Sequence, residues 1–289
     1  MWQSITKQIS ECMDAPFTIE KHQLLLNTSD SSYYRITDQK HVISFVVRIT
    51  PKSLAAKFDI LTRNLALMAD WLISPKIILY GTTSDQCFVV FQPFDVKENT
   101  QPLPDEWYEL GKCFARMHQR CQQGMYGWEE DTFIFEQIQP NRWQKNWASF
   151  FSEQRIGWQL QLHEEKGRHL INIADMTSVI HRLLHHHHPE PSLLHGQLLA
   201  DNILVTSAGL FLPDNACYCG DRELDLAWLT TFSPDCDDFM RGYTETWRLP
   251  QGFETRQVIY ALYPLLVQLH NNPELETRVQ HHIALILAI

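Results

Sequence analysis

The spacing of hydrophobic residues changes near residue 92, and this change limits the folds that the chain can adopt. Before it, short runs rich in β-branched and aromatic residues, such as 33–37 and 42–49, lie between turn-like segments. Such runs are typical of β-strands. After residue 104, apolar residues recur at helical spacing over longer stretches. We therefore predict an α+β protein with a small β-rich part followed by a larger, mainly helical part.

The same patterns predict the order of the elements. In the first part we expect an antiparallel sheet with one helix, in the order β-β-α-β-β, with strands within residues 17–35, 41–49, 76–80 and 87–91, a turn at 37–40 and a helix over 51–69. In the second part we expect helices over residues 107–122, 141–166, 175–186, 256–270 and 274–288, with loops and short strands over 192–212.

A boundary between the two parts is marked by residues 92–104, which contain three prolines and few apolar residues. We predict a β-rich N-terminal lobe over residues 1–92, a hinge over 93–104 and a helical C-terminal lobe over 105–289. A small sheet lobe joined by a short hinge to a large helical lobe is the arrangement that a nucleotide-binding cleft requires.

Charge and hydropathy exclude several classes of partner. Among 289 residues, 34 acidic side chains outnumber 24 basic ones, so the net charge is −10. This balance argues against nucleic acid or membrane phosphates as main partners. The longest apolar runs are far shorter than the ~20 residues of a membrane-spanning helix, and the N-terminus lacks the apolar core of a secretory signal. We expect a monomeric cytoplasmic protein that binds neither nucleic acid nor a membrane.

Three compositional features have competing interpretations. Seven cysteines, an odd number without a C-x-x-C pair, indicate a reducing compartment and exclude a disulfide framework. The run His185–His188 could bind a metal, but we favour an exposed linker. Trp143, Trp147 and Trp158 could stack on a ligand, but aromatic residues at helical spacing favour packing.

Residues 193–229 carry the clearest sign of chemistry. Two short apolar strands, 203–205 and 210–212, are joined by a turn, so Asn202 and Asp214 are expected at neighbouring strand ends. Mg²⁺ in proteins is held by one or two such side-chain oxygens, with phosphates and water completing its shell. The alternative is that Asn202 and Asp214 each stabilise a turn, because both residue types favour turns. Their pairing across a hairpin favours the metal site.

Three segments resemble known phosphotransferases, and two of them resemble one family in particular. Residues 195–214 are similar to the catalytic and metal-binding loops of protein-kinase-like phosphotransferases, in which H-G-D-x-x-x-x-N precedes a strand and a metal-binding Asp. Residues 216–229, ACYCGDRELDLAWL, resemble the fructosamine (ketosamine) kinase family within the aminoglycoside phosphotransferase superfamily. Residues 139–167 match that family's W-x-x-x-W-x-x-F-F-x-x-Q-R-I-G-W-Q-L pattern.

The resemblance implies a bilobal protein-kinase-like fold that uses ATP and Mg²⁺. It also implies phosphorylation of the sugar 3-hydroxyl of a ketosamine, a glycation adduct on a small amine or a protein lysine, in deglycation repair. Carried over by position, His195, Gly196 and Asn202 belong to the catalytic loop, and Asp214 is the metal-binding Asp. Within Gly220–Asp225, the resemblance assigns Asp221 and Arg222 to the acceptor pocket. Asp225 either anchors the catalytic loop or caps a helix.

The sequence departs from the family at the catalytic position itself. Gln197 stands where the family has the Asp that accepts the proton of the substrate hydroxyl and orients its oxygen. An amide can hold a hydrogen bond but cannot take the proton, and losing a general base typically costs about 10²–10⁴-fold. Asp201 or Asp221 could act as a substitute base.

Three further departures lie in the first part of the chain. An ungapped comparison places Arg48 at the position of the family's phosphate-contacting Lys and Leu61 at the position of its helical Glu partner, with Asp59 near but on another helix face. The turn segment 27–35 contains no glycine, so its backbone is less suited to approach phosphates. Its Asp30 would also face phosphate with the wrong sign.

Three functions remain open after these departures. One is a ketosamine kinase with reduced or altered activity, as Asn202, Asp214 and the 139–167 match suggest. Another is a pseudokinase that binds nucleotide or another ligand without phosphoryl transfer. A third keeps the fold but uses another acceptor, as aminoglycoside or choline phosphotransferases do.

Overall fold

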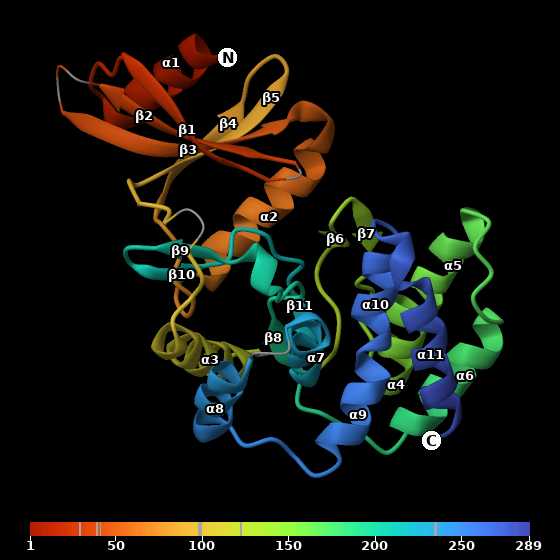
Figure 1. Cartoon of the computed structure of the whole chain (residues 1–289). Coiled ribbons are helices and arrows are strands. Elements are labelled where there is room, and N and C mark those ends of the chain that lie inside the picture. Colours follow the sequence, from red (N-terminus) through yellow and green to blue (C-terminus); the bar gives the residue numbers. More distant parts are fainter. Residues whose placement is uncertain (29, 39, 41, 98–99, 122, 234–235) are drawn as a thin grey trace. The chain divides into compact units, whose positions relative to one another are not determined.

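The computed structural model describes residues 1–28, 30–38, 40, 42–97, 100–121, 123–233 and 236–289. The chain forms two compact units (Figure 1): Met1–Pro102 with Ile203–Pro213, and Leu103–Asn202 with Asp214–Ile289. The segment Ile203–Pro213 is therefore in the first unit, whereas we expected it in the C-terminal lobe. Of the expected hinge and turn, residues 98–99 and 39 lie outside the described residues.

The first unit is built on a five-stranded antiparallel sheet with strand order β1-β2-β3-β5-β4. Its strands are β1 (Lys21–Asn27), β2 (Ser32–Asp38), β3 (Ile43–Pro51), β4 (Ile77–Thr82) and β5 (Gln86–Phe91). An antiparallel sheet with a helix between its strands is confirmed, because α2 (Ala55–Met68) lies between β3 and β4 along the chain, after the short 3-10 turn η1 (Lys52–Leu54). The predicted order β-β-α-β-β is wrong in its first part, because the one strand expected within residues 17–35 is two paired strands, β1 and β2.

A helix that the sequence analysis did not predict, α1 (Trp2–Met13), covers one face of this sheet. Ile5 and Ile9 of α1 pack with Phe45 and Val47 of β3 in one apolar cluster. Successive residues of a strand point to opposite faces, so Val46 faces the other side. The sheet is therefore buried on both faces.

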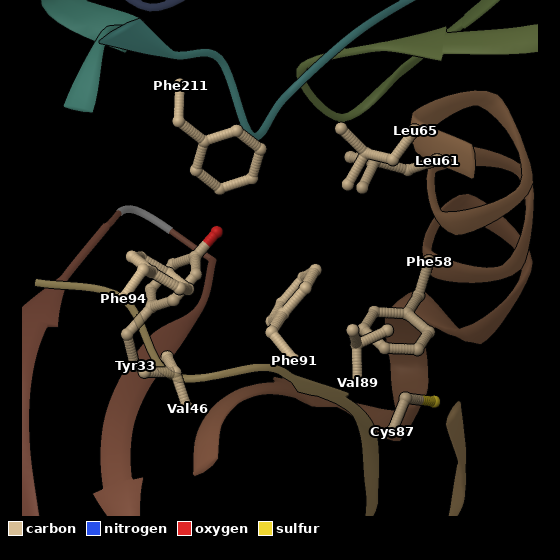
Figure 2. Close-up of a cluster of buried hydrophobic side chains, with 10 residues drawn as sticks. All are labelled: Tyr33, Val46, Phe58, Leu61, Leu65, Cys87, Val89, Phe91, Phe94 and Phe211. Atoms are coloured by element: carbon tan, nitrogen blue, oxygen red, sulfur yellow. The ribbon is translucent and has the colours of Figure 1, made fainter. Parts of the chain in front are cut away.

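The second face packs against α2 and a distant hairpin. Figure 2 shows this cluster, in which Phe58, Leu61 and Leu65 of α2 face aromatic side chains of the sheet. The hairpin of β9 (Leu204–Thr206) and β10 (Gly209–Phe211) contributes Phe211. The ring centroid of Phe211 lies 6.3 Å from that of Phe91. This contact explains why the hairpin belongs to the first unit.

The second unit is mainly helical. Its helices are α3 (Pro104–His118), α4 (Trp147–Phe151), α5 (Trp158–Glu165), α6 (Ile173–Leu184), α7 (Glu223–Phe232), α8 (Asp237–Thr246), α9 (Phe253–Tyr260), α10 (Leu262–Leu269) and α11 (Glu276–Leu287). Its strands are the short pairs β6 (Thr132–Ile134) with β7 (Gln137–Gln139) and β8 (Ser192–Leu194) with β11 (Tyr218–Gly220). Short 3-10 turns are η3 (Ala200–Asn202) and η4 (Pro273–Leu275).

The helix expected over residues 141–166 begins only at Trp147 and contains a π-helical segment, η2 (Ser152–Gly157). Arg155 of this segment is fully buried, and its guanidinium carbon lies 4.0 Å from the ring centroid of Tyr218. Trp147 is also buried and donates a hydrogen bond from Nε1 to the Tyr260 hydroxyl at 2.7 Å. Packing is therefore the role of Trp147, as expected.

One expectation about cysteine is wrong. Cys121 and Cys219 form a disulfide in the second unit, although 98 positions separate them in the sequence. The remaining five cysteines carry thiols. The spacing of the cysteines in the sequence does not predict this bond, because only the fold brings β11 next to the segment after α3. Among the described residues, no helix is both long and apolar enough to cross a membrane.

Candidate functional site

The loop that follows β8 is buried and is held by one carboxylate. Asp225, in the first turn of α7, accepts hydrogen bonds from the backbone N–H of His195 at 2.7 Å and of Gly196 at 2.8 Å. The N-cap of α7 is Arg222. Of the two roles that the sequence left open for Asp225, the structure supports loop anchor and not helix cap.

A buried histidine that the sequence analysis missed completes this anchor. Nε2 of His118 lies 3.0 Å from Oδ2 of Asp225, and its Nδ1 lies 2.7 Å from the Tyr243 hydroxyl. His118 ends α3 and is 107 positions from Asp225 in the sequence. No local motif marks such a pair, so only the fold could have revealed it.

Gly196 fits a position that other residues cannot occupy. Its φ is +79°, and an added Cβ would lie 2.2 Å from the carbonyl oxygen of Ala216. Left-handed backbone is accessible to glycine at little cost. The neighbouring backbone N–H of Ala216 donates to the carbonyl of His195 at 2.9 Å. The loop is thereby fixed against the segment that carries Asp214.

The His195 side chain is enclosed by protein. Neither ring nitrogen has a hydrogen-bond partner among the described residues, and its ring centroid lies 5.7 Å from that of Phe114. Burial lowers the pKa of His195 to about 4, against the opposing effect of Asp225 and Asp214. The imidazole is therefore neutral near pH 7, and its environment is that of a packing residue.

Gln197, at the family's catalytic position, and Asp201, the possible substitute base, differ in exposure. Gln197 directly follows Gly196 and is only 6% exposed. Asp201 is exposed in η3. The buried position on the anchored loop thus carries an amide, while the carboxylate four residues later lies at the surface. A substitute-base role for Asp201 stays a prediction.

Asn202 and Asp214 lie next to each other at the two ends of the β9–β10 hairpin. Nδ2 of Asn202 donates to the backbone carbonyl of Asp214 at 3.0 Å. This bond leaves Oδ1 as the acceptor of the Asn202 amide. This contact is to the backbone of Asp214, and the two side chains offer an amide oxygen and a carboxylate, which are donor types that suit Mg²⁺. The structure brings the predicted pair together, and metal binding by it stays a prediction.

Asp221 is fully engaged by neighbouring protein groups. It accepts from the Tyr260 hydroxyl at 2.6 Å and from the Glu223 backbone N–H at 3.0 Å, and His187 Nε2 lies 2.7 Å from its Oδ2. Burial alone would raise the pKa of Asp221, but these hydrogen bonds and the nearby His187 lower it below its ordinary value. The expected exposed linker 185–188 is therefore wrong for His187, whose side chain is only 18% exposed.

Arg222 is likewise occupied within the second unit. Its Nη2 donates to the carbonyl of Arg248 at 2.6 Å, and its guanidinium carbon lies 3.8 Å from the Trp247 ring centroid. With Asp221, it lines a cavity of about 320 Å³. Gly220, which directly precedes Asp221, pairs with Ser192 at the start of β8. The catalytic-type loop, which begins at His195, follows the other end of β8, so Asp221 and this loop lie at opposite ends of the strand. An acceptor-binding role for Asp221 and Arg222 stays a prediction.

A metal in this network would compete with existing contacts. His187, Asp221 and Glu223 each offer an atom within 4.8 Å of one another. Both carboxylate oxygens of Glu223, however, accept from Arg256, at 2.7 and 2.8 Å. The Arg256 guanidinium, whose side chain is 12% exposed, satisfies this carboxylate and repels a cation, so these contacts favour a structural network over a metal site.

The predicted phosphate cation, Arg48, has polar partners within the first unit. Its Nε donates to the Ser31 hydroxyl at 2.8 Å and its Nη1 to the carbonyl of Pro213 at 3.2 Å. Its Nη2 lies 3.5 Å from Oδ1 of Asp30. Lys57 of α2 approaches the same carboxylate, with its Nζ 2.5 Å from Oδ2.

The helix α2 does not present a Glu at the compared position. Leu61 packs in the apolar cluster, and Asp59 is exposed and pairs with Arg63 at 3.2 Å. Asp59 is thus on another face of α2, as expected. The sequence analysis missed Lys57, because nothing in its local pattern distinguishes it from an ordinary surface lysine.

Comparisons with known proteins agree with this architecture. A family profile described as "Fructosamine kinase" matches residues 1–288. A probable ketoamine kinase of Vibrio parahaemolyticus is 36% identical over 270 residues, covering 92% of each chain. The probable ketoamine kinase YniA of Escherichia coli K12 is 34% identical over 271 residues, with the same coverage of both chains.

Solved structures show the fold. A putative fructosamine-3-kinase from Haemophilus somnus has a TM-score of 0.88 at 31% identity, covering 99% of this chain and 98% of that one. A thermostable mutant of the aminoglycoside phosphotransferase APH(4)-Ia, solved with ADP and hygromycin B, has a TM-score of 0.61 at 12% identity, covering 99% of this chain and 98% of that one. The expected protein-kinase-like fold is confirmed, and the chain belongs to the fructosamine kinase family.

Proposed function

We propose that this chain is an ATP-dependent ketosamine kinase in which phosphoryl transfer is slow. The substrate would be a small-molecule or protein-bound ketosamine, phosphorylated on the sugar 3-hydroxyl in deglycation repair. The observation that carries the proposal is the adjacency of Asn202 and Asp214 beside a loop anchored by Asp225. An anchored loop with two oxygen ligands is what positioning a metal and a phosphate requires.

Each residue has a defined part in this proposal. Asn202 and Asp214 would hold Mg²⁺, which neutralises charge on the phosphates when it is bound. Arg48 would contact phosphate, since it stands at the position of the family's Lys. His195 would keep the loop in shape as a neutral, buried side chain. Gln197 would hold the acceptor hydroxyl by a hydrogen bond without removing its proton.

The amide at Gln197 leads to the first test. With ATP, Mg²⁺ and a ribulosamine or fructosamine substrate, we expect slow formation of the phosphorylated product by the wild type. Gln197→Asp restores a carboxylate and should raise kcat about 10²-fold or more, because a general base typically contributes about 10²–10⁴-fold. Gln197→Asn is the matched control, since it has the length of Asp without its charge.

A second candidate function is a pseudokinase that binds ligand without transfer. It is favoured by the buried amide Gln197 and by the contact of Arg48 with Asp30. Absence of product with both the wild type and Gln197→Asp at high enzyme concentration would reject the kinase. A rise in melting temperature with ATP and Mg²⁺ under those conditions would favour the pseudokinase, because ligands stabilise the state that they bind.

The proposal also covers partners and location. We infer a monomeric cytoplasmic protein that does not bind nucleic acid or membranes. The net charge of −10 supports the part of this inference that concerns nucleic acid and membranes, because phosphate-rich surfaces attract basic proteins. Size-exclusion chromatography with light scattering measures the mass in solution, and a mass near twice that of the chain would contradict the monomer.

A further inference from the structure

One carboxylate in the first unit lies between two cations from different elements. Asp30 precedes β2, Arg48 is in β3 and Lys57 is in α2. Oδ2 of Asp30 lies 2.5 Å from Lys57 Nζ, and its Oδ1 lies 3.5 Å from Arg48 Nη2. The side chains of Asp30, Arg48 and Lys57 are only 8%, 3% and 12% exposed. The three charges are thus held together largely out of water.

Burial of such groups needs compensation. Lysine and arginine are seldom buried unless they are paired, because a charge loses its hydration on leaving water. A hydroxyl adds to the arrangement, since Ser31 accepts from Arg48 Nε at 2.8 Å and donates to Oδ1 of Asp30 at 3.1 Å. Cationic N–H groups and a hydroxyl that converge on a pair of oxygens form the kind of site that binds phosphate.

We propose that Asp30 substitutes internally for a phosphate group, that Lys57 is a second phosphate-binding cation beside Arg48, and that a bound nucleotide must displace Asp30. This inference rests on the nucleotide binding proposed above. It identifies the acidic side chain, and not only the lost glycine of the turn, as the feature that weakens phosphate binding.

Asp30 competes at neutral pH because it remains ionised. Burial alone would raise its pKa, but Lys57 and Arg48 lower it below its ordinary value. When ATP binds, Arg48 and Lys57 therefore exchange their ion pairs with Asp30 for ion pairs with phosphate. The phosphates then add little to the free energy of binding. Without Mg²⁺, we expect ATP to bind the wild type less than 10-fold more tightly than adenosine does, about the effect of 1.4 kcal/mol.

Isothermal titration calorimetry with tripolyphosphate, ATP and adenosine tests the proposal. Asp30→Asn keeps the shape of the side chain and removes its charge. This variant should bind tripolyphosphate and ATP at least 10-fold more tightly than the wild type does, with adenosine affinity unchanged. Asp59→Asn removes an exposed acid from α2, so this matched control should behave as the wild type does.

A double variant tests the role of Lys57. Asp30→Asn with Lys57→Gln should lose most of the gain in tripolyphosphate affinity, whereas retention of the gain would overturn the role of Lys57. No gain in Asp30→Asn would overturn the proposal for Asp30. If thermal melting shows that Asp30→Asn is unfolded, Asp30→Ser serves as the second variant, with the same expected gain.

The nucleoside arm separates this inference from the proposed function. If neither adenosine nor ATP binds any of the variants, the nucleotide assignment is wrong. Titration with tripolyphosphate then still decides whether Asp30 blocks an anion site. If adenosine binds all variants equally and tripolyphosphate never gains affinity, the proposed function stands and the role of Asp30 is rejected.

Discussion

The carboxylate of Asp225 is the residue on which the geometry of the catalytic-type loop depends. It accepts from two backbone N–H groups of the loop and contacts the ring of His118, all without exposure to water. A carboxylate offers acceptors on both oxygens, whereas an amide offers only one. Substitution by Asn would therefore leave a buried backbone N–H facing an NH₂ group.

We expect Asp225→Asn to lower the free energy of unfolding by about 2–4 kcal/mol, because buried hydrogen bonds to a charged group are lost and a donor remains unsatisfied. Urea denaturation measures this loss. The matched control is Asp238→Asn in the first turn of α8, whose partly exposed carboxylate pairs with Arg241. The control should lose less than about 1 kcal/mol. Equal losses in the two variants would contradict the anchor role.

At this scale, the sequence identified the residues that share a short loop or hairpin. Asn202 and Asp214 were recognisable because a hairpin brings its two ends together, and the structure places them in contact. Asp225 was recognisable from the family motif. His118 and Lys57 were not, because their partners lie 107 and 27 positions away and the contacts exist only after folding.

Among elements, strand and helix patterns predicted the antiparallel sheet of the first unit and its helix α2, but they merged β1 and β2 into one strand. They failed at α1, whose buried face is confined to Ile5 and Ile9, and at the π-helical segment η2, which sequence periodicity does not distinguish from an α-helix. They also gave no sign of the Cys121–Cys219 disulfide. This bond joins β11 to the segment after α3, whose last residue, His118, contacts Asp225.

Reduction of this disulfide should destabilise the second unit. A disulfide that closes a loop of about 100 residues lowers the entropy of the unfolded chain, which raises the free energy of unfolding by up to about 4.7 kcal/mol in the chain-entropy account. We therefore expect dithiothreitol to lower the melting temperature of the wild type. Cys121→Ser should show the lower value without reductant and no further change with it. Cys12→Ser, at an exposed thiol, should respond as the wild type does. An unchanged wild-type melting temperature would contradict this prediction.

For the whole molecule, composition and periodicity predicted a β-rich part and a helical part but not which segments form each unit. The hairpin Ile203–Pro213 joins the first unit because Phe211 packs with Phe91 and Phe94. Those contacts span more than 100 positions, and no local pattern encodes them. The departures at Gln197 and Arg48 were readable from the sequence, whereas the ion pairs around Arg48 required the structure.

Histidines that the fold keeps neutral should make the stability of the molecule depend on pH. Burial lowers the pKa of His195 to about 4 and, with nearby His163, Lys166 and Arg168, that of His270 to about 3. The unfolded chain binds these protons near pH 6.5, but the folded chain does not. Between about pH 6.5 and 4 the unfolded state therefore holds more protons, so stability falls as the pH falls.

Urea denaturation at pH 7.5, 6.5, 5.5 and 4.5 measures this dependence. Each such proton contributes a slope of up to about 1.4 kcal/mol per pH unit. His270→Phe keeps an aromatic ring beside His163, whose centroid lies 3.7 Å away, but removes the titrating group. This variant should show a shallower slope than the wild type, whereas His281→Gln, at an exposed position of α11, should leave the slope unchanged.

Because the lowered pKa of Asp30 affects stability only as the pH falls through its ordinary value of 3.8, this acid does not account for a loss above pH 4.5. A wild-type slope retained in His270→Phe would show that this histidine is not held neutral by the fold.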